Sequence, residues 1–95
     1  MIRAQATVHT KHAGRLARQM GRHFGHKVRV DTDGGDVRVW IPTGTFRLRP
    51  DGDRLRVEAA ADDAAGLEGV QSVVADHLMR FGRPEAIEVG WAPAP

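Results

Sequence analysis

Apolar and polar residues alternate from Val28 to Ala61, and this alternation constrains the fold more than any other feature of the chain. In a β-strand, successive side chains point to opposite faces of the sheet, so a period of two sorts them into two sets. Here one set is apolar and the other contains six arginines. The pattern predicts an antiparallel sheet with one packed face and one face open to solvent or to a partner.

Two amphipathic segments that predict helices flank this region. Apolar residues recur at helical spacing over Lys11–Phe24, with Thr10 as the expected N-cap and Gly25 as the expected left-handed residue at the helix end. A second helix is expected to follow a cap at Asp62 and to end near Phe81. Both helices need a surface for their apolar stripes, and the packed face of the sheet supplies it.

Short extended segments complete the predicted order of elements. The first strand is expected at Arg3–Val8, and a short last strand at Ile87–Trp91, after Pro84. Between the two helices, glycine, proline and aspartate mark the connections between strands. These connections are one loop and two turns, at residues 31–36, 42–44 and 50–53.

The element order predicts the fold class. We expect a two-layer α+β sandwich, with an antiparallel sheet of about five to six strands and two helices on one face. The order along the chain is β-α-β-β-β-β-α-β. Residues 1–91 are expected to form a single domain, and residues 92–95 a flexible tail.

The composition narrows the classes of function. Without cysteine the chain forms neither disulfides nor thiolate catalytic or metal sites. Its apolar stretches fall short of the roughly 20 residues that a membrane span needs, and its first residues lack the order of a secretion signal, so we expect a cytoplasmic protein. The net charge of +2 is too small to attract a polyanion over a long range.

Motifs of catalysis are few in this sequence. Ser72 lies within the second predicted helix rather than on a strained turn between a strand and a helix. Gly34 and Gly35 lack the helix and the lysine of a phosphate-binding loop, and the aspartates beside them lack the glutamate that ends a calcium loop. We therefore expect a small binding or accessory module rather than a free-standing enzyme.

Three histidines form the first candidate site. His23 and His26 lie three residues apart at the end of the first predicted helix, and His77 lies in the second. Imidazoles from neighbouring helices can bind one transition metal ion, and a single histidine can serve as the axial ligand of haem iron. The alternative is a structural role, in which His23 and His77 lie at the edges of the apolar stripes and hydrogen-bond to the backbone or to a carboxylate.

The open face of the predicted sheet is the second candidate site. Strand parity places one tryptophan, six arginines and Glu58 on it. Guanidinium groups pair with phosphate or carboxylate, and an exposed indole can stack on a base, as in proteins that bind single-stranded nucleic acid. Alternatively the arginines are solvated, or the face contacts a protein partner. The candidate residues for an anion or a nucleic acid are Arg29, Arg38, Trp40, Arg47, Arg49, Arg54 and Arg56.

Two segments of the chain resemble a known family. Arg22–Val28 and Val73–Phe81 are similar to small bacterial proteins grouped as domain of unknown function 2218, and the similarity spans nearly the whole chain. Some members resemble an addition to flavoproteins that reduce ferric siderophores, so the resemblance implies an iron-linked context. In that context His23, His26 and His77 would bind a metal or haem, or tune the redox centre of an iron-reducing flavoprotein partner. Anion or nucleic-acid binding and homodimerisation are the competing hypotheses.

Overall fold

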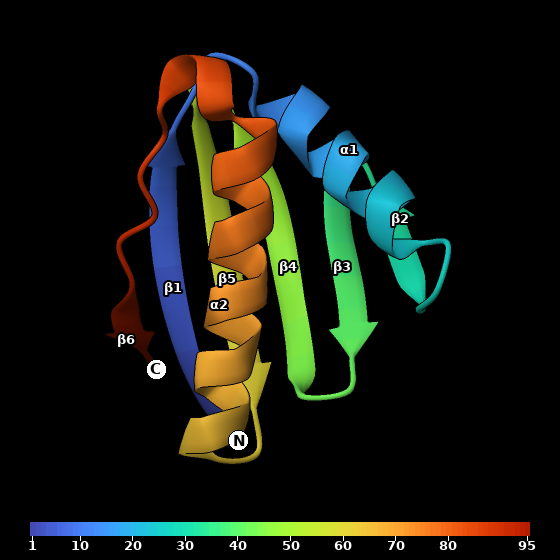
Figure 1. Ribbon diagram of the computed structural model, residues 1–95, viewed down its shortest axis with the longest axis vertical. Coiled ribbons are helices and arrows are strands. Elements are labelled where there is room, and N and C mark those ends of the chain that lie inside the picture. The colour runs from blue at the N-terminus through green and yellow to red at the C-terminus, as the bar shows by residue number, and fades with distance from the viewer.

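Six strands and two helices make up the computed structural model, which describes residues 1–95 (Figure 1). The strands are β1 (Ile2–His9), β2 (Val30–Asp33), β3 (Asp36–Ile41), β4 (Gly44–Asp51), β5 (Arg54–Ala61) and β6 (Ala92–Ala94). The helices are α1 (Ala13–Phe24) and α2 (Ala64–Phe81), followed by the short 3-10 helix η1 (Arg83–Glu85). All strands join one antiparallel sheet in the order β2-β3-β4-β5-β1-β6, with both helices on one face. The predicted two-layer α+β fold is confirmed.

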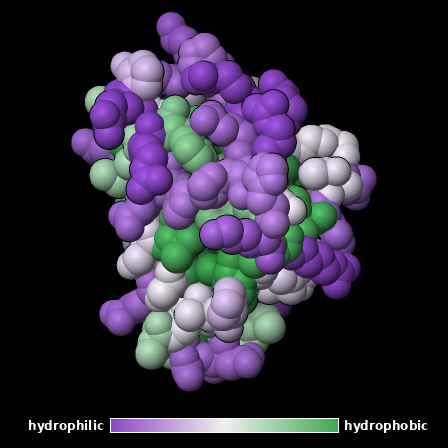
Figure 2. Space-filling view, turned by 45° about the vertical axis from the view of Figure 1, so that its right-hand side comes forward, coloured by the Kyte–Doolittle hydropathy of each residue, from purple (hydrophilic) through white to green (hydrophobic).

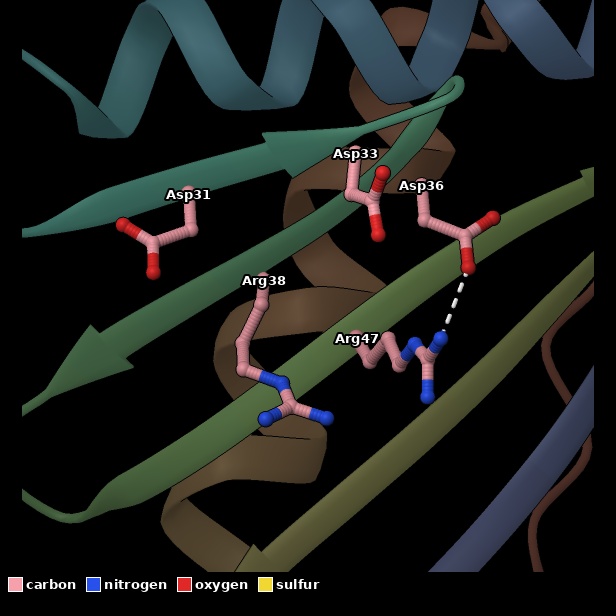
Figure 3. A pocket seen from close by; sticks show the side chains of 5 residues that line it. All are labelled: Asp31, Asp33, Asp36, Arg38 and Arg47. Carbon is pink, nitrogen blue, oxygen red and sulfur yellow. Dashed lines mark hydrogen bonds and ion pairs between the residues drawn. The ribbon is translucent and has the colours of Figure 1, made fainter.

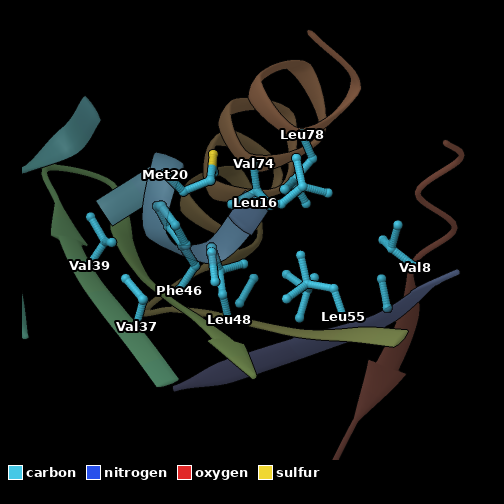
Figure 4. Packing of buried hydrophobic residues seen from close by; sticks show 14 of the residues in the cluster. Val8, Leu16, Met20, Val37, Val39, Phe46, Leu48, Leu55, Val74 and Leu78 are labelled. Atoms are coloured by element: carbon cyan, nitrogen blue, oxygen red, sulfur yellow. The ribbon is translucent and has the colours of Figure 1, made fainter. Parts of the chain in front are cut away.

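The core is formed by every second side chain of the central strands. Buried side chains of β3, β4 and β5 alternate with more exposed ones, and the buried set points toward the helices. Leu16 and Met20 from α1 and Leu78 from α2 meet Phe46 and Leu55 of the sheet in one cluster (Figure 4). Complete burial of a side chain of this size stabilises a fold by about 1.5–3 kcal/mol. The opposite face of the sheet has no covering layer and is open.

The start of α1 differs from the prediction. Thr10 is buried, and its hydroxyl accepts the His12 N–H and donates to the carboxylate of Glu85 instead of capping a helix at Lys11. Glu85 also accepts the Lys11 N–H, at 3.1 Å, and so ties η1 to the segment between β1 and α1. The residues after Thr10 form a turn, and α1 begins at Ala13 without a side-chain cap at His12.

Two further predictions about helix ends were wrong. Gly25 follows α1 but does not have the expected left-handed backbone, and the N-cap of α2 lies one residue later than expected. Gly25 has a φ of −62° and is right-handed, since the chain continues in a turn in which the Val28 N–H donates to the Phe24 carbonyl. At α2, Asp63 rather than Asp62 is the N-cap, because Asp63 has the extended backbone and its carboxylate accepts a first-turn N–H at 2.7 Å. Neither helix combines the length and the apolar character that crossing a membrane requires.

The connection expected as a loop at residues 31–36 is a two-residue turn. β2 runs to Asp33 and β3 starts at Asp36, so Gly34 and Gly35, with φ values of 60° and 97°, form the whole connection. Positive φ at both central residues is the geometry of a tight hairpin. Asp31, Asp33 and Asp36 are therefore strand residues, and their parity matches that of the arginines.

The last strand lies later in the chain than predicted. Ile87–Trp91 forms no strand, because its apolar side chains pack against the edge of the core; Ile87 is buried, and Val89 and Trp91 are partly buried. Ala92–Ala94, which was expected to be part of a flexible tail, forms β6 and pairs with β1.

Candidate functional site

All seven residues predicted for the open face lie there in the structure. Arg38 is opposite Arg47 in the ladder, and Arg47 is opposite Glu58, so their side chains share one face. Arg29 precedes β2, and its guanidinium lies over the Trp40 indole, 4.1 Å from the ring centroid. The remaining members of the set, on β4 and β5, have the same parity: Arg49, Arg54 and Arg56.

Carboxylates lie between these arginines. Asp36 accepts a hydrogen bond from Arg47 at 2.8 Å and lies 3.4 Å from Arg49, and Arg29 pairs with Asp31 at 3.0 Å. Looser pairs, at 3.4 and 3.6 Å, are Arg56–Asp51 and Arg49–Glu58. Pairs this exposed add little stability, typically about 0–1 kcal/mol each, but they neutralise most of the arginine charge.

Sequence reasoning missed the acidic part of the open face. It treated residues 31–36 as a loop, whereas the tight hairpin keeps three aspartates in register with the arginines. The available signal was the Gly34-Gly35 pair between two alternating segments, which is typical of a two-residue hairpin. Arg3 was also missed, because the parity argument stopped at the central strands and did not extend to β1. In the ladder, Arg3 lies opposite Ala60.

A polar hollow of about 240 Å³ lies at the acidic end of this face (Figure 3). Its lining consists of Asp31, Asp33, Asp36, Arg38 and Arg47. Arg47 donates to Asp36, whereas Arg38 forms no ion pair. Three carboxylates outnumber two guanidinium groups here, so the hollow disfavours an extended polyanion.

A second hollow, of about 420 Å³, lies next to the first. We call it the notch and define it by Arg3, Arg38, Trp40, Thr45 and Ala60, which all line it. Thr45 and Ala60 are opposite each other on the two central strands and are small, so they leave space above the sheet. Arg38 lines both hollows, and neither Arg38 nor Arg3 forms an ion pair. The notch therefore holds two guanidinium groups without a carboxylate partner beside an indole.

The histidines are brought together only in part. On the helix side, where hydrophobic residues reach the surface between hydrophilic ones (Figure 2), the His23 ring centroid lies 4.9 Å from that of His77. Phe24 and Phe81 pack against this pair, with ring centroids 4.8 Å from His77 and 5.6 Å from His23, respectively. Nδ1 of His77 donates to the Val73 carbonyl at 2.7 Å. This is the backbone hydrogen bond that a structural role predicts.

The surroundings of His23 do not fit a metal ion. His23 is exposed, but partial desolvation lowers its pKa, and the positive charges of His77, Arg80, His26 and Lys27 lower it further. A metal ion at His23 would meet the fixed positive charges of Arg80 and Lys27, and none of the groups that shift the pKa of His23 is a carboxylate. No group of three or more histidine, aspartate and glutamate side chains is placed to hold a metal ion. The three-histidine site that the iron-linked context implies has no support in this geometry.

The fold and the open face define the class: a small two-layer α+β domain with one sheet face free for contact. The chain belongs to the family described as "Uncharacterized protein conserved in bacteria (DUF2218)", whose model matches residues 5–92. The predicted resemblance is thus confirmed. The chain is also similar to PA4090 from Pseudomonas aeruginosa, solved by NMR, with 30% identity and a TM-score of 0.84 over 99% of this chain and 98% of that chain. No curated protein matches.

Proposed function

We propose that this protein is a small binding module that holds an anionic group of its ligand on the open sheet face, at Arg38. The observation that carries the proposal is the contrast among the arginines there. Arg29, Arg47, Arg49 and Arg56 have carboxylate partners, whereas Arg38 has none and lines both hollows.

A free guanidinium at a hollow is suited to bind an anion. Its planar fork donates two parallel hydrogen bonds to a carboxylate or a phosphate. A hydrogen bond to a charged group contributes about 1.5–3 kcal/mol. Arg3 lines the same notch without a partner and provides a second cation for the ligand.

The distribution of charge favours a compact anion over single-stranded nucleic acid. A single strand of nucleic acid that crossed this face would pass Asp31, Asp33 and Asp36 on one side and Glu58 near the middle. Each carboxylate repels a phosphate, and the affinity of nucleic-acid binding depends on neutralising several phosphates in a row. One anionic group at Arg38 avoids this repulsion.

The test is an NMR titration of the ¹⁵N-labelled protein with inorganic phosphate at constant ionic strength. We expect saturable shifts at Arg38, Trp40 and Thr45. The variant Arg38→Gln should lose this saturation, and the matched control Arg54→Gln should keep it, because Arg54 is an exposed arginine of the same face that lines neither hollow. Equal loss in both variants, or shifts confined to the arginines of α1, would contradict the proposal.

A further inference from the structure

The notch has its shape because of four residues that lie in one row across the sheet. Trp40 on β3 is opposite Thr45 on β4, Thr45 is opposite Ala60 on β5, and Ala60 is opposite Arg3 on β1. A large side chain therefore stands at each end of the row, and two small ones form the floor between them. Neighbouring strands are about 4.8 Å apart, so the two ends are separated by roughly 14 Å at the backbone.

The indole at one end of the row is held in place. Arg29 lies over the ring of Trp40, and the backbone N–H of Trp40 donates to the Arg29 carbonyl at 3.1 Å. Asp31 holds the same guanidinium at 3.0 Å. The indole is half-buried and also lines the notch. It thus offers a fixed aromatic wall, which reduces the ordering that a ligand must impose on binding.

Charges along the side of the notch restrict the ligand further. The adjacent row contains Arg38, Arg47 and Glu58. Arg47 is engaged by Asp36, so Arg38 is the free cation of this row, and Glu58 is the acceptor opposite Arg47. Glu58 also lines the notch, and an acidic group at Arg38 on β3 lies two strands away from it on β5. A second acidic group elsewhere on the same ligand would meet the Glu58 carboxylate.

We infer that the notch binds a planar aromatic ring that carries one carboxylate or phosphate group. The ring lies against Trp40 above Thr45 and Ala60, and the acidic group is held by Arg38, which is on the same strand as Trp40, while Arg3 stands at the far end of the row. A volume of about 420 Å³ suits a ligand of one or two fused rings, since pockets for small molecules measure roughly 300–1,000 Å³. The inference rests on the proposed function, because it uses the same arginine and adds the aromatic wall.

The test compares four probes by calorimetry and NMR on the full chain: 2-naphthoate, adenosine monophosphate, acetate and inorganic phosphate. Stacking on an aromatic side chain adds to affinity, so at least one aromatic probe should bind roughly 10-fold more tightly than its non-aromatic counterpart. The naphthoate and nucleotide arms distinguish a carboxylate ligand from a phosphate ligand. The decamer dT10 tests the nucleic-acid alternative, and binding of dT10 that is tighter than that of every small probe would contradict the inference.

Two variants fill the notch without removing a charge. Ala60→Leu adds bulk from β5 and Thr45→Leu adds it from β4, and both positions are half-buried on the open face, so the core is not altered. Each variant should lose the roughly 10-fold aromatic preference and keep the phosphate shifts at Arg38. If one of these two variants does not fold, the other still tests the inference. Aromatic and non-aromatic probes of equal affinity would overturn the inference and leave the proposed function standing, whereas absence of any anion effect at Arg38 would remove both.

Discussion

Replacement of Gly44 by alanine tests how the floor of the notch is built. A Cβ at Gly44 would lie 2.2 Å from the carbonyl oxygen of Ala60 and 2.9 Å from Cγ2 of Val70. Side-chain carbons do not approach other atoms within 3.0 Å, and the Ala60 atom belongs to the backbone, which cannot rotate away. β4 and β5 would have to separate by roughly 1 Å at the Thr45–Ala60 pair.

The loss in the free energy of unfolding follows from this separation of β4 and β5. Overpacking of a dense core costs about 1–3 kcal/mol, and a weakened backbone hydrogen bond about 1 kcal/mol, so Gly44→Ala should lower the free energy of unfolding by about 2–4 kcal/mol. For a domain of this size, 1 kcal/mol corresponds to about 4–8 °C in Tm, which predicts a decrease of roughly 10–30 °C.

Thermal and urea unfolding followed by circular dichroism measure this loss. Gly90→Ala is the matched control, because a Cβ there meets no atom within 4 Å and its backbone has no positive φ. The control should unfold within a few degrees of the parent protein. If Gly44→Ala unfolded at the same temperature as Gly90→Ala, the close approach of β4 and β5 at the floor of the notch would be refuted.

Four further predictions concern pH, metal and assembly. Partial desolvation and cationic neighbours lower the pKa of folded His23 below 6.5, so the free energy of unfolding, measured in urea, should fall as pH drops below about 6.5. His23→Gln should reduce this dependence on pH, and the same dependence in the variant would contradict the lowered pKa of His23. The Thr10 hydroxyl lowers the pKa of Glu85 below 4.5, so a second loss, absent in Glu85→Gln, should appear below about pH 4.5. Micromolar Zn²⁺ should not raise the Tm, and a rise that His23→Ala abolishes would restore the metal hypothesis. Sedimentation equilibrium should show a monomer, because aspartates on β2 and Pro93 on β6 protect both sheet edges; a concentration-dependent dimer would contradict this.

Local patterns in the sequence were sufficient to predict most of the fold. The alternation over Val37–Ile41 and Leu55–Ala59 predicts which side chains are buried, and the structure has the same parity. The helical stripe ending at Phe81 was also predicted correctly. These features depend on the period of hydrophobic residues, which a single sequence displays directly.

The errors arose where contacts distant in sequence decide local structure. Thr10 is a reasonable N-cap by type and its hydroxyl accepts the His12 N–H, but Glu85, 75 residues away, also binds this segment, and α1 begins only at Ala13. The segment Ile87–Trp91 alternates like a strand, yet packing against the core takes precedence over pairing with β1. Alternation identifies the residues of one strand that share a sheet face. It does not show which strands are neighbours or which of their residues lie opposite each other.

The candidate site illustrates the same limit. Trp40 and Arg38 were predicted on the open face from parity alone. The notch depends on the register that aligns Trp40, Thr45, Ala60 and Arg3, which are spread over 58 positions of the sequence. Likewise, the spacing of His23 and His26 suggested a shared metal, but the cations around His23 depend on how α1 packs against α2.

The most direct test of the central claim is to observe the Nε–Hε resonances of the arginine side chains by NMR during a phosphate titration. The account predicts that Arg38 responds first and saturates, that Arg3 follows, and that Arg54 and the arginines of α1 respond only weakly, as expected for unspecific screening. A uniform response of all twelve arginines would contradict the account and would show that the open face is merely solvated.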